Sequence, residues 1–165
     1  MTFVGTARID WAKITANSVT ITAGGTDATS VVASLQTAFD GNFFHLDEVA
    51  ATPGIDLIID FINVTAFNWV QALDVYAGSA SHAVAIQLYN WITTTWDTFN
   101  AAQDGQHDIA TAGGYIMDNH SFFVPSDTNY IGTGGSAGQV RVHYYHTMSG
   151  TASHDLYIDV VALYQ

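Results

Sequence analysis

Apolar and polar residues alternate along much of the chain, and this period-two pattern predicts β-strands with one buried face. Val84, Ile86 and Leu88 fall on one side of such a strand, while Gln87 and Tyr89 fall on the other. The same alternation recurs over residues 67–76, 140–144 and 155–162. In the last of these segments it predicts that one face of a single strand carries Leu156, Ile158, Val160 and Ala162.

Further strand candidates follow from β-branched and aromatic content: residues 18–22, 31–39, 43–49, 57–64 and 121–124. Residues 28–38 have the length of a short helix, but their Val, Thr and Ser content favours a strand. Asp40-Gly41, between two of these segments, predicts a hairpin turn. About nine or ten short strands with frequent turns predict an all-β fold, an antiparallel jelly-roll-type β-sandwich.

The expected organisation is one domain over residues 1–165, long enough for a sizeable core. Residues 1–16 have a weaker pattern and form an N-terminal arm or an edge strand. Residues 100–114 and 125–138 look like long loops, which in a small domain tend to be functional or interfacial.

The charge balance excludes two classes of partner. Three basic residues stand against fifteen acidic ones, a net charge of −12. Nucleic acids and anionic membranes both require clustered Lys and Arg, so neither is an expected partner. No apolar run approaches the ~20 residues that span a bilayer, and no export signal is visible, so a soluble protein is expected. Fourteen of the fifteen acids are Asp, a residue of turns and loops, which agrees with a loop-rich β-protein.

No motif predicts catalysis. Residues 134–138 match G-x-S-x-G, but a nucleophile elbow needs a strand before it and a helix after it, and a strand is expected to follow here. The neighbouring acids Asp47 and Glu48 point to opposite faces of a strand, so they cannot act as a glycosidase pair. Asp60 is expected to be a structural polar residue, with Arg141 as its candidate partner. The chain has no cysteine, which excludes a cysteine nucleophile. From these observations together we expect that the protein is not an enzyme.

The metal chemistry of the sequence is limited. His143 and His146 lie three apart on a strand and therefore on opposite faces, and none of the seven histidines has zinc-motif spacing. Asp104, Asp118 and Asp127 are candidate ligands for a structural calcium ion in the loops. No other cofactor is predicted.

The functional candidates are aromatic. Tyr89, Trp91, Trp96 and Tyr157 include residues on the apparent solvent face of their strands. Three interpretations stay open: core packing, with Trp96 and Phe99 closing one end of the sandwich; a subunit interface; or stacking on sugar rings.

Several segments of the chain resemble known protein families, and this resemblance limits the range of expected functions. Its residues are Phe61-Ile62-Asn63-Val64, Val75-Tyr76-Ala77-Gly78 with His82, Gln87-Leu88-Tyr89-Asn90, Trp96-Asp97, Gly138-Gln139-Val140-Arg141-Val142 and His154-Asp155-Leu156-Tyr157-Ile158-Asp159. This part of the chain resembles β-sandwich accessory proteins of tailed bacteriophage particles, and it also looks like the jelly-roll domains of carbohydrate-binding modules. The resemblance implies a non-enzymatic virion protein that decorates a capsid or forms a head fibre or fibre knob. It also implies that the protein forms a homotrimer and that it binds capsid or tail proteins.

The alternative is a carbohydrate-binding module, or a receptor-binding tail-tip domain that contacts host glycans. The sequence does not distinguish capsid decoration from attachment, because both require a stable adhesive β-surface.

Overall fold

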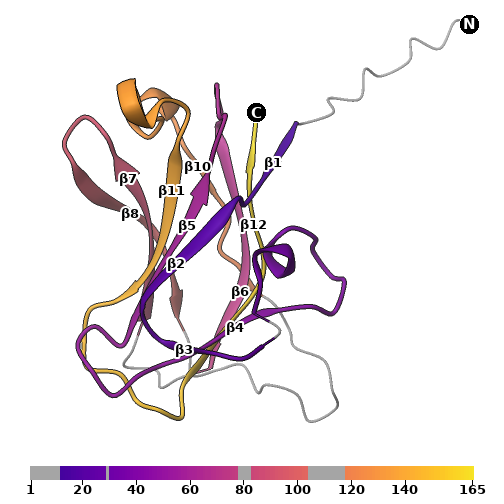
Figure 1. Cartoon of the computed structure of the whole chain (residues 1–165), viewed down its shortest axis with the longest axis vertical. Coiled ribbons are helices and arrows are strands. Elements are labelled where there is room, and N and C mark those ends of the chain that lie inside the picture. The colour runs from indigo at the N-terminus through magenta and orange to yellow at the C-terminus, as the bar shows by residue number, and fades with distance from the viewer. Residues whose placement is uncertain (1–11, 29, 78–82, 104–117) are drawn as a thin grey trace, which may run out of the picture.

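The computed structural model describes residues 12–28, 30–77, 83–103 and 118–165, which form two antiparallel β-sheets packed face to face (Figure 1). The five-stranded sheet runs in the order β2 (Ser18–Ala23), β5 (Ile55–Phe61), β11 (Val140–His146), β7 (Ala83–Asn90) and β8 (Thr95–Gln103). The path of the seven-stranded sheet is β10 (Phe122–Phe123), β6 (Trp69–Ala77), β12 (Asp155–Tyr164), β4 (Phe44–Asp47) and β3 (Gly25–Thr26). Two further strands join it: β1 (Lys13–Thr15) pairs with β12, and β9 (Asp118–Asn119) pairs with β6.

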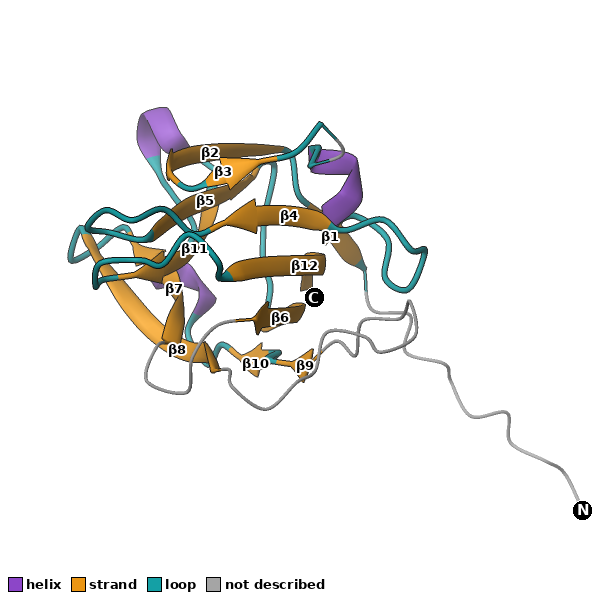
Figure 2. Ribbon diagram, turned by 90° about the horizontal axis from the view of Figure 1, so that it is seen from below, coloured by secondary structure: helices purple, strands orange, loops and turns teal. Residues whose placement is uncertain are grey.

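The two layers separate clearly when the sandwich is viewed from below (Figure 2). One layer holds β5, β11, β7 and β8, and the other holds β4, β12, β6 and β10. The predicted antiparallel jelly-roll-type sandwich is therefore confirmed. None of the helices in the described ranges has the length and apolar character needed to cross a bilayer.

The core lies between the sheets, as the alternation in the sequence requires. In β5 the odd-numbered residues are fully buried, and in β7 the even-numbered apolar residues are. The predicted inward set of Val84, Ile86 and Leu88 is confirmed, as is that of Val140, Val142 and Tyr144 in β11. Burying these side chains supplies the main favourable term for folding, about 1.5–3 kcal/mol for each large apolar group.

The prediction of a strand over residues 31–39 is wrong. This segment contains a 3-10 helix, η1 (Val32–Leu35), which inserts the Leu35 side chain into the core. After it, Phe39 takes a positive φ of 58°, and its amide N–H donates to the carboxylate of Asp159. Asp40-Gly41 therefore joins η1 to β4 and is not a hairpin turn. Contacts distant in sequence overrode the local β-propensity here.

The single face predicted for β12 is also wrong, because a β-bulge interrupts the strand. The register with β6 shifts between Ile158 and Val160. Leu156 and Ile158 point into the main core, but beyond the shift Val160 and Ala162 point outwards into a second cluster. One extra residue in a strand moves every later side chain to the opposite face.

The terminal arm and the long loops are partly described. Lys13–Thr15 forms the edge strand β1, and residues 1–11 lie outside the described ranges. The first predicted loop begins later than expected because β8 continues to Gln103, and residues 104–117 are again outside. The second contains two 3-10 helices, η2 (Asp127–Asn129) and η3 (Gly134–Ser136).

Candidate functional site

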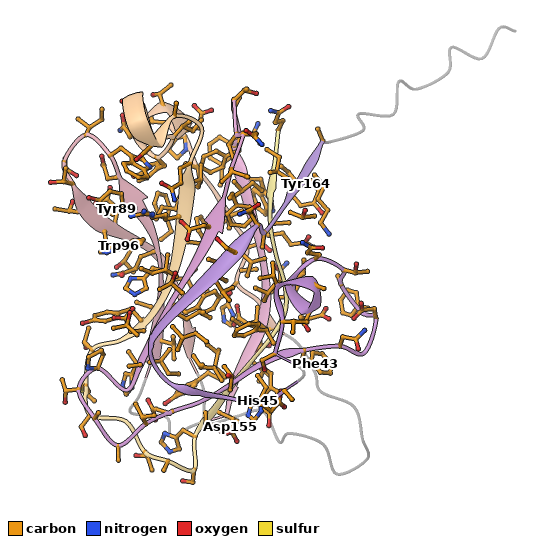
Figure 3. All side chains as sticks on the ribbon, in the orientation of Figure 1. Phe43, His45, Tyr89, Trp96, Asp155 and Tyr164 are labelled. Atoms are coloured by element: carbon orange, nitrogen blue, oxygen red, sulfur yellow. The ribbon has the colours of Figure 1, made fainter. Side chains whose placement is uncertain are left out.

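Five aromatic and imidazole rings form a continuous row on the outer face of the five-stranded sheet. They belong to Trp91, which follows β7, Tyr89 on β7, Trp96 on β8, and His143 and Tyr145 on β11. Along the row the successive centroid distances are 4.9, 5.1, 4.4 and 4.8 Å. We call this set the aromatic row. Figure 3 shows Tyr89 and Trp96 side by side on β7 and β8.

Strand register brings the rings together. Tyr89 lies directly opposite Trp96 in the β7–β8 pair, and Tyr145 lies opposite Ala85 of β7. Every second residue of a strand points to the same side of the sheet. The residues of β7 and β11 that alternate with the core positions therefore project to the same outer surface. The site residues on β7 and β11 thus occupy the outward positions of strands whose inward positions form the core.

The turn after β7 positions Trp91, which lies at one end of the aromatic row. The Asn90 side-chain oxygen accepts hydrogen bonds from the amides of Ile92 and Thr93, at 3.0 and 3.1 Å. The backbone N–H of Trp91 donates to the carbonyl of Asn129. These contacts fix the backbone that carries the Trp91 indole.

A guanidinium group covers one end of the row. The Arg141 Cζ lies 5.7 Å from the Tyr89 ring centroid and 5.1 Å from that of Trp91, within cation–π range. Its Nε donates to Asp60 Oδ1 at 3.2 Å, and the Gln139 amide donates to the same oxygen at 2.8 Å. The predicted Asp60–Arg141 partnership is therefore confirmed, and it holds a planar cation against two aromatic rings.

Polar contacts fix the imidazole within the row. His143 Nδ1 lies 3.0 Å from Gln87 Oε1, and Nε2 lies 2.9 Å from Asp56 Oδ1. Burial lowers the pKa of His143, with Asp56 opposing the shift. The Gln87 amide in turn donates to Thr98 Oγ1 at 3.0 Å. The surface therefore offers aromatic faces and edges beside amide, hydroxyl, carboxylate and guanidinium groups.

The rings are not coplanar. Tyr89 is inclined by 82° to Trp91 and by 69° to Trp96, both edge-to-face arrangements. His143 is buried within the row, whereas Tyr89, Trp91 and Trp96 are partly exposed. A ligand on these three residues would meet ring faces and ring edges, rather than one flat platform.

Three of the four aromatic residues singled out from the sequence are brought together, namely Tyr89, Trp91 and Trp96. The fourth, Tyr157, lies on β12 of the other sheet and stacks on His45, with centroids 4.4 Å apart and an angle of 2°. Trp96 does not close the end of the core, whereas Phe99 does pack on the core.

Tyr145 was not among the residues predicted from the sequence, and neither His143 nor Arg141 was predicted as a site residue. The signal was present, because all three alternate with the core residues of β11.

The candidate calcium ligands are not shown to share a site. Asp118 lies on β9, and Asp127 Oδ2 accepts a hydrogen bond from the Phe67 amide at 3.0 Å. Asp104 lies outside the described residues. The calcium site stays a prediction.

The two features considered for hydrolysis have structural explanations. Residues 134–138 contain η3 and lead into strand β11, so no helix follows the G-x-S-x-G match. Glu48 is buried, whereas the neighbouring Asp47 is half exposed beside His45. The predicted divergence of these two acids is confirmed.

Comparisons with known proteins establish the fold. No family model matches the chain, and no curated protein does. Among solved structures, the xylan-binding module CBM15 aligns over 98% of this chain and 93% of its own, with a TM-score of 0.53 and 11% identity. At this identity the similarity extends to the fold alone.

Two larger proteins contain a more distant match. A Paenibacillus cycloisomaltooligosaccharide glucanotransferase, solved with cycloisomaltoheptaose, aligns over 93% of this chain with a TM-score of 0.45 and 12% identity. The enzymatically active domain of tailspike protein 4 of bacteriophage CBA120 aligns over 95%, with a TM-score of 0.43 and 11% identity. The chain spans only 18% and 20% of these proteins. TM-scores below 0.5 support no conclusion about function.

Proposed function

We propose that this protein is a non-catalytic carbohydrate-binding protein and that the aromatic row is its binding surface. The observation that carries the proposal is the continuity of the row: five rings from three strands and a turn, with no centroid gap above 5.1 Å. Sugars present apolar C–H faces and many hydroxyl groups. Such ligands require aromatic surface and polar side chains side by side.

The polar groups of the row are suited to hydroxyl recognition. Asp56, Gln87 and Thr98 flank its centre, and Arg141 with Asp60 flanks one end. Their mutual hydrogen bonds fix their orientation before a ligand arrives, which lowers the entropic cost of binding. The name of the xylan-binding module suggests a β-linked polysaccharide as the first class of ligand to test.

The decisive experiment compares one aromatic substitution in the row with one outside it. Calorimetric titration with soluble xylan and with xylo-, cello- and malto-oligosaccharides would be done on the wild type, Trp96→Ala and Trp69→Ala. Trp69 is the matched control, since it is 37% exposed and lies on the other sheet.

We expect Trp96→Ala to weaken glycan binding about tenfold or more, the effect of truncating a central aromatic contact. We expect Trp69→Ala to bind like the wild type. Absence of binding to every glycan tested, or loss of binding in Trp69→Ala alone, would refute the proposal.

A virion structural role is the second candidate function. It is supported by apolar side chains on the seven-stranded sheet: Trp69 and Phe123 face each other across β6 and β10, at 37% and 57% exposure. Trp69 also lines a concavity of about 500 Å³, together with Leu73 and Tyr164. Exposed apolar patches of this kind suit contact between subunits.

In that role the chain would form a homotrimer and pack on capsid or tail proteins. Sedimentation equilibrium tests this directly. A trimer in the wild type that dissociates in Phe123→Ser would support it, and a monomer that binds no isolated particle would count against it.

A further inference from the structure

A second group of polar side chains lies on the outer face of the seven-stranded sheet, away from the aromatic row. His45 and Asp47 come from β4, and Asp155 and Tyr157 come from β12. The two strands pair so that Asp155 is opposite Asp47 and Tyr157 is opposite His45. Figure 3 shows His45 and Asp155 together at one end of these strands.

The potential ligand atoms converge on one point. His45 Nε2 lies 3.1 Å from Asp47 Oδ1 and 3.2 Å from Asp155 Oδ1, and one ligand atom from each residue lies within 4.8 Å of the others. Ligands about 2.1 Å from a tetrahedral zinc ion lie about 3.4 Å from one another. The two spacings from His45 Nε2 are close to that value, and the two carboxylate oxygens lie within 4.8 Å of each other.

The imidazole is held from two sides. Its ring stacks on Tyr157, and its Nδ1 lies 3.4 Å from Asp27 Oδ2. Asp27 is itself oriented, since its Oδ1 accepts hydrogen bonds from the amide and hydroxyl of Ser30, each 3.0 Å long. A carboxylate behind a histidine is the usual outer support of a metal site, because it fixes the tautomer that directs the other nitrogen towards the metal.

The charge distribution also favours a cation. Like charges directly opposite in an antiparallel pair destabilise a sheet, yet Asp47 and Asp155 occupy such positions. Three carboxylates, those of Asp27, Asp47 and Asp155, surround the imidazole of His45. The Lys and Arg side chains in the described ranges are used elsewhere: Lys13 binds the Gln36 carbonyl, and Arg141 binds Asp60.

We propose that His45, Asp47 and Asp155 bind a divalent transition-metal ion of the zinc class, with Asp27 as the outer support of His45. One imidazole and two carboxylates suit zinc, whereas calcium prefers oxygen ligands alone. The ion joins β4 to β12 and stabilises the folded chain by binding it in preference to the unfolded chain. Three protein ligands leave a coordination position for water.

Zinc binding by the full, untagged chain is the first test. Equilibrium dialysis and calorimetry with ZnCl2, and separately with CaCl2, would be applied to the wild type, His45→Gln, Asp155→Asn and Asp27→Asn. Asp40→Asn is the control, because it removes one acidic charge from an exposed position outside the cluster. We expect one zinc ion per chain in the wild type and in Asp40→Asn, with much weaker calcium binding.

The variants are expected to differ by position. His45→Gln and Asp155→Asn lose binding at least 100-fold, and Asp27→Asn weakens it by about 10- to 100-fold, as outer-support substitutions do. Thermal unfolding adds a readout that an ion-pair role would not produce. Without metal, Asp155→Asn melts above the wild type because repulsion from Asp47 is relieved, and with zinc it melts below the wild type.

Failure to bind zinc in the wild type, or binding unaffected by His45→Gln, overturns the proposal. If a variant does not fold, titrating zinc into the wild type while following histidine ring nitrogens by NMR decides the question. The proposal requires the largest shift at His45 Nε2, and a shift at His146 or His154 in its place refutes it. Trp96→Ala should bind zinc like the wild type, so the outcome is independent of glycan binding.

Discussion

The Tyr144 hydroxyl donates a 2.8 Å hydrogen bond across the core to Asp74 Oδ2, joining β11 of one sheet to β6 of the other. Both side chains are fully buried. The second oxygen of Asp74 lies 2.8 Å from His120 Nδ1. The carboxylate is buried with a partner for each oxygen, and this lowers the otherwise large cost of removing it from water.

Tyr144→Phe tests this relationship. The substitution preserves the ring but leaves Asp74 Oδ2 without its donor, so we expect a loss of about 1–3 kcal/mol in the free energy of unfolding. Urea unfolding would measure it. Tyr164→Phe is the control, since it removes a hydrogen bond to Gln71 from a partly exposed ring and should cost less. Equal losses in the two variants would contradict this explanation.

His120 should make stability fall as pH rises. The hydrogen bond to Asp74 is the main cause that raises the pKa of His120 above 6.5. The folded chain therefore holds this proton more tightly than the unfolded chain does. The stabilisation is complete below pH ~6.5 and disappears as pH rises through the folded-state pKa. The difference in urea midpoint between the wild type and His120→Gln should shrink from pH 5.5 to pH 8.5, and a constant difference would exclude this linkage.

His143 should have the opposite pH dependence. Burial lowers its pKa below 6.5, so the unfolded chain holds its proton more tightly. The favourable contribution of the neutral ring is present above pH ~6.5 and is lost as pH falls through the folded-state pKa. The advantage of the wild type over His143→Gln should decline between pH 7 and pH 5. A difference that grows on acidification would show that the ring is stabilised in its charged form.

Gly150 should tolerate no side chain. A Cβ there would collide with the Val49 carbonyl oxygen and the Glu48 side chain. Because backbone and a buried side chain block the space, Gly150→Ala should cost about 1–3 kcal/mol. At Gly135 a Cβ meets nothing within 4 Å, so Gly135→Ala should stay within about 0.5 kcal/mol of the wild type. Thermal unfolding compares the two, and similar melting temperatures would disprove the packing argument.

The sequence alone determined the fold class and much of the core. Alternation in β7 and β11 identified the inward residues, because a strand with one buried face must repeat every two residues. The same alternation indicated that Tyr89 faces outwards, whereas the orientation of Trp96 stayed open. Local pattern cannot reveal an irregularity imposed by distant neighbours, however. The bulge in β12 and the 3-10 helix at Val32–Leu35 depend on packing against other strands and on Asp159.

The sites were decided by tertiary structure. Strand register joined Tyr89, Trp96 and His143 from three strands into one row, and it placed Asp47 opposite Asp155 although they are 108 positions apart. Periodicity specifies the side of a strand on which a residue lies. It does not specify which strands become neighbours or in what register, because those depend on the packing of the whole core.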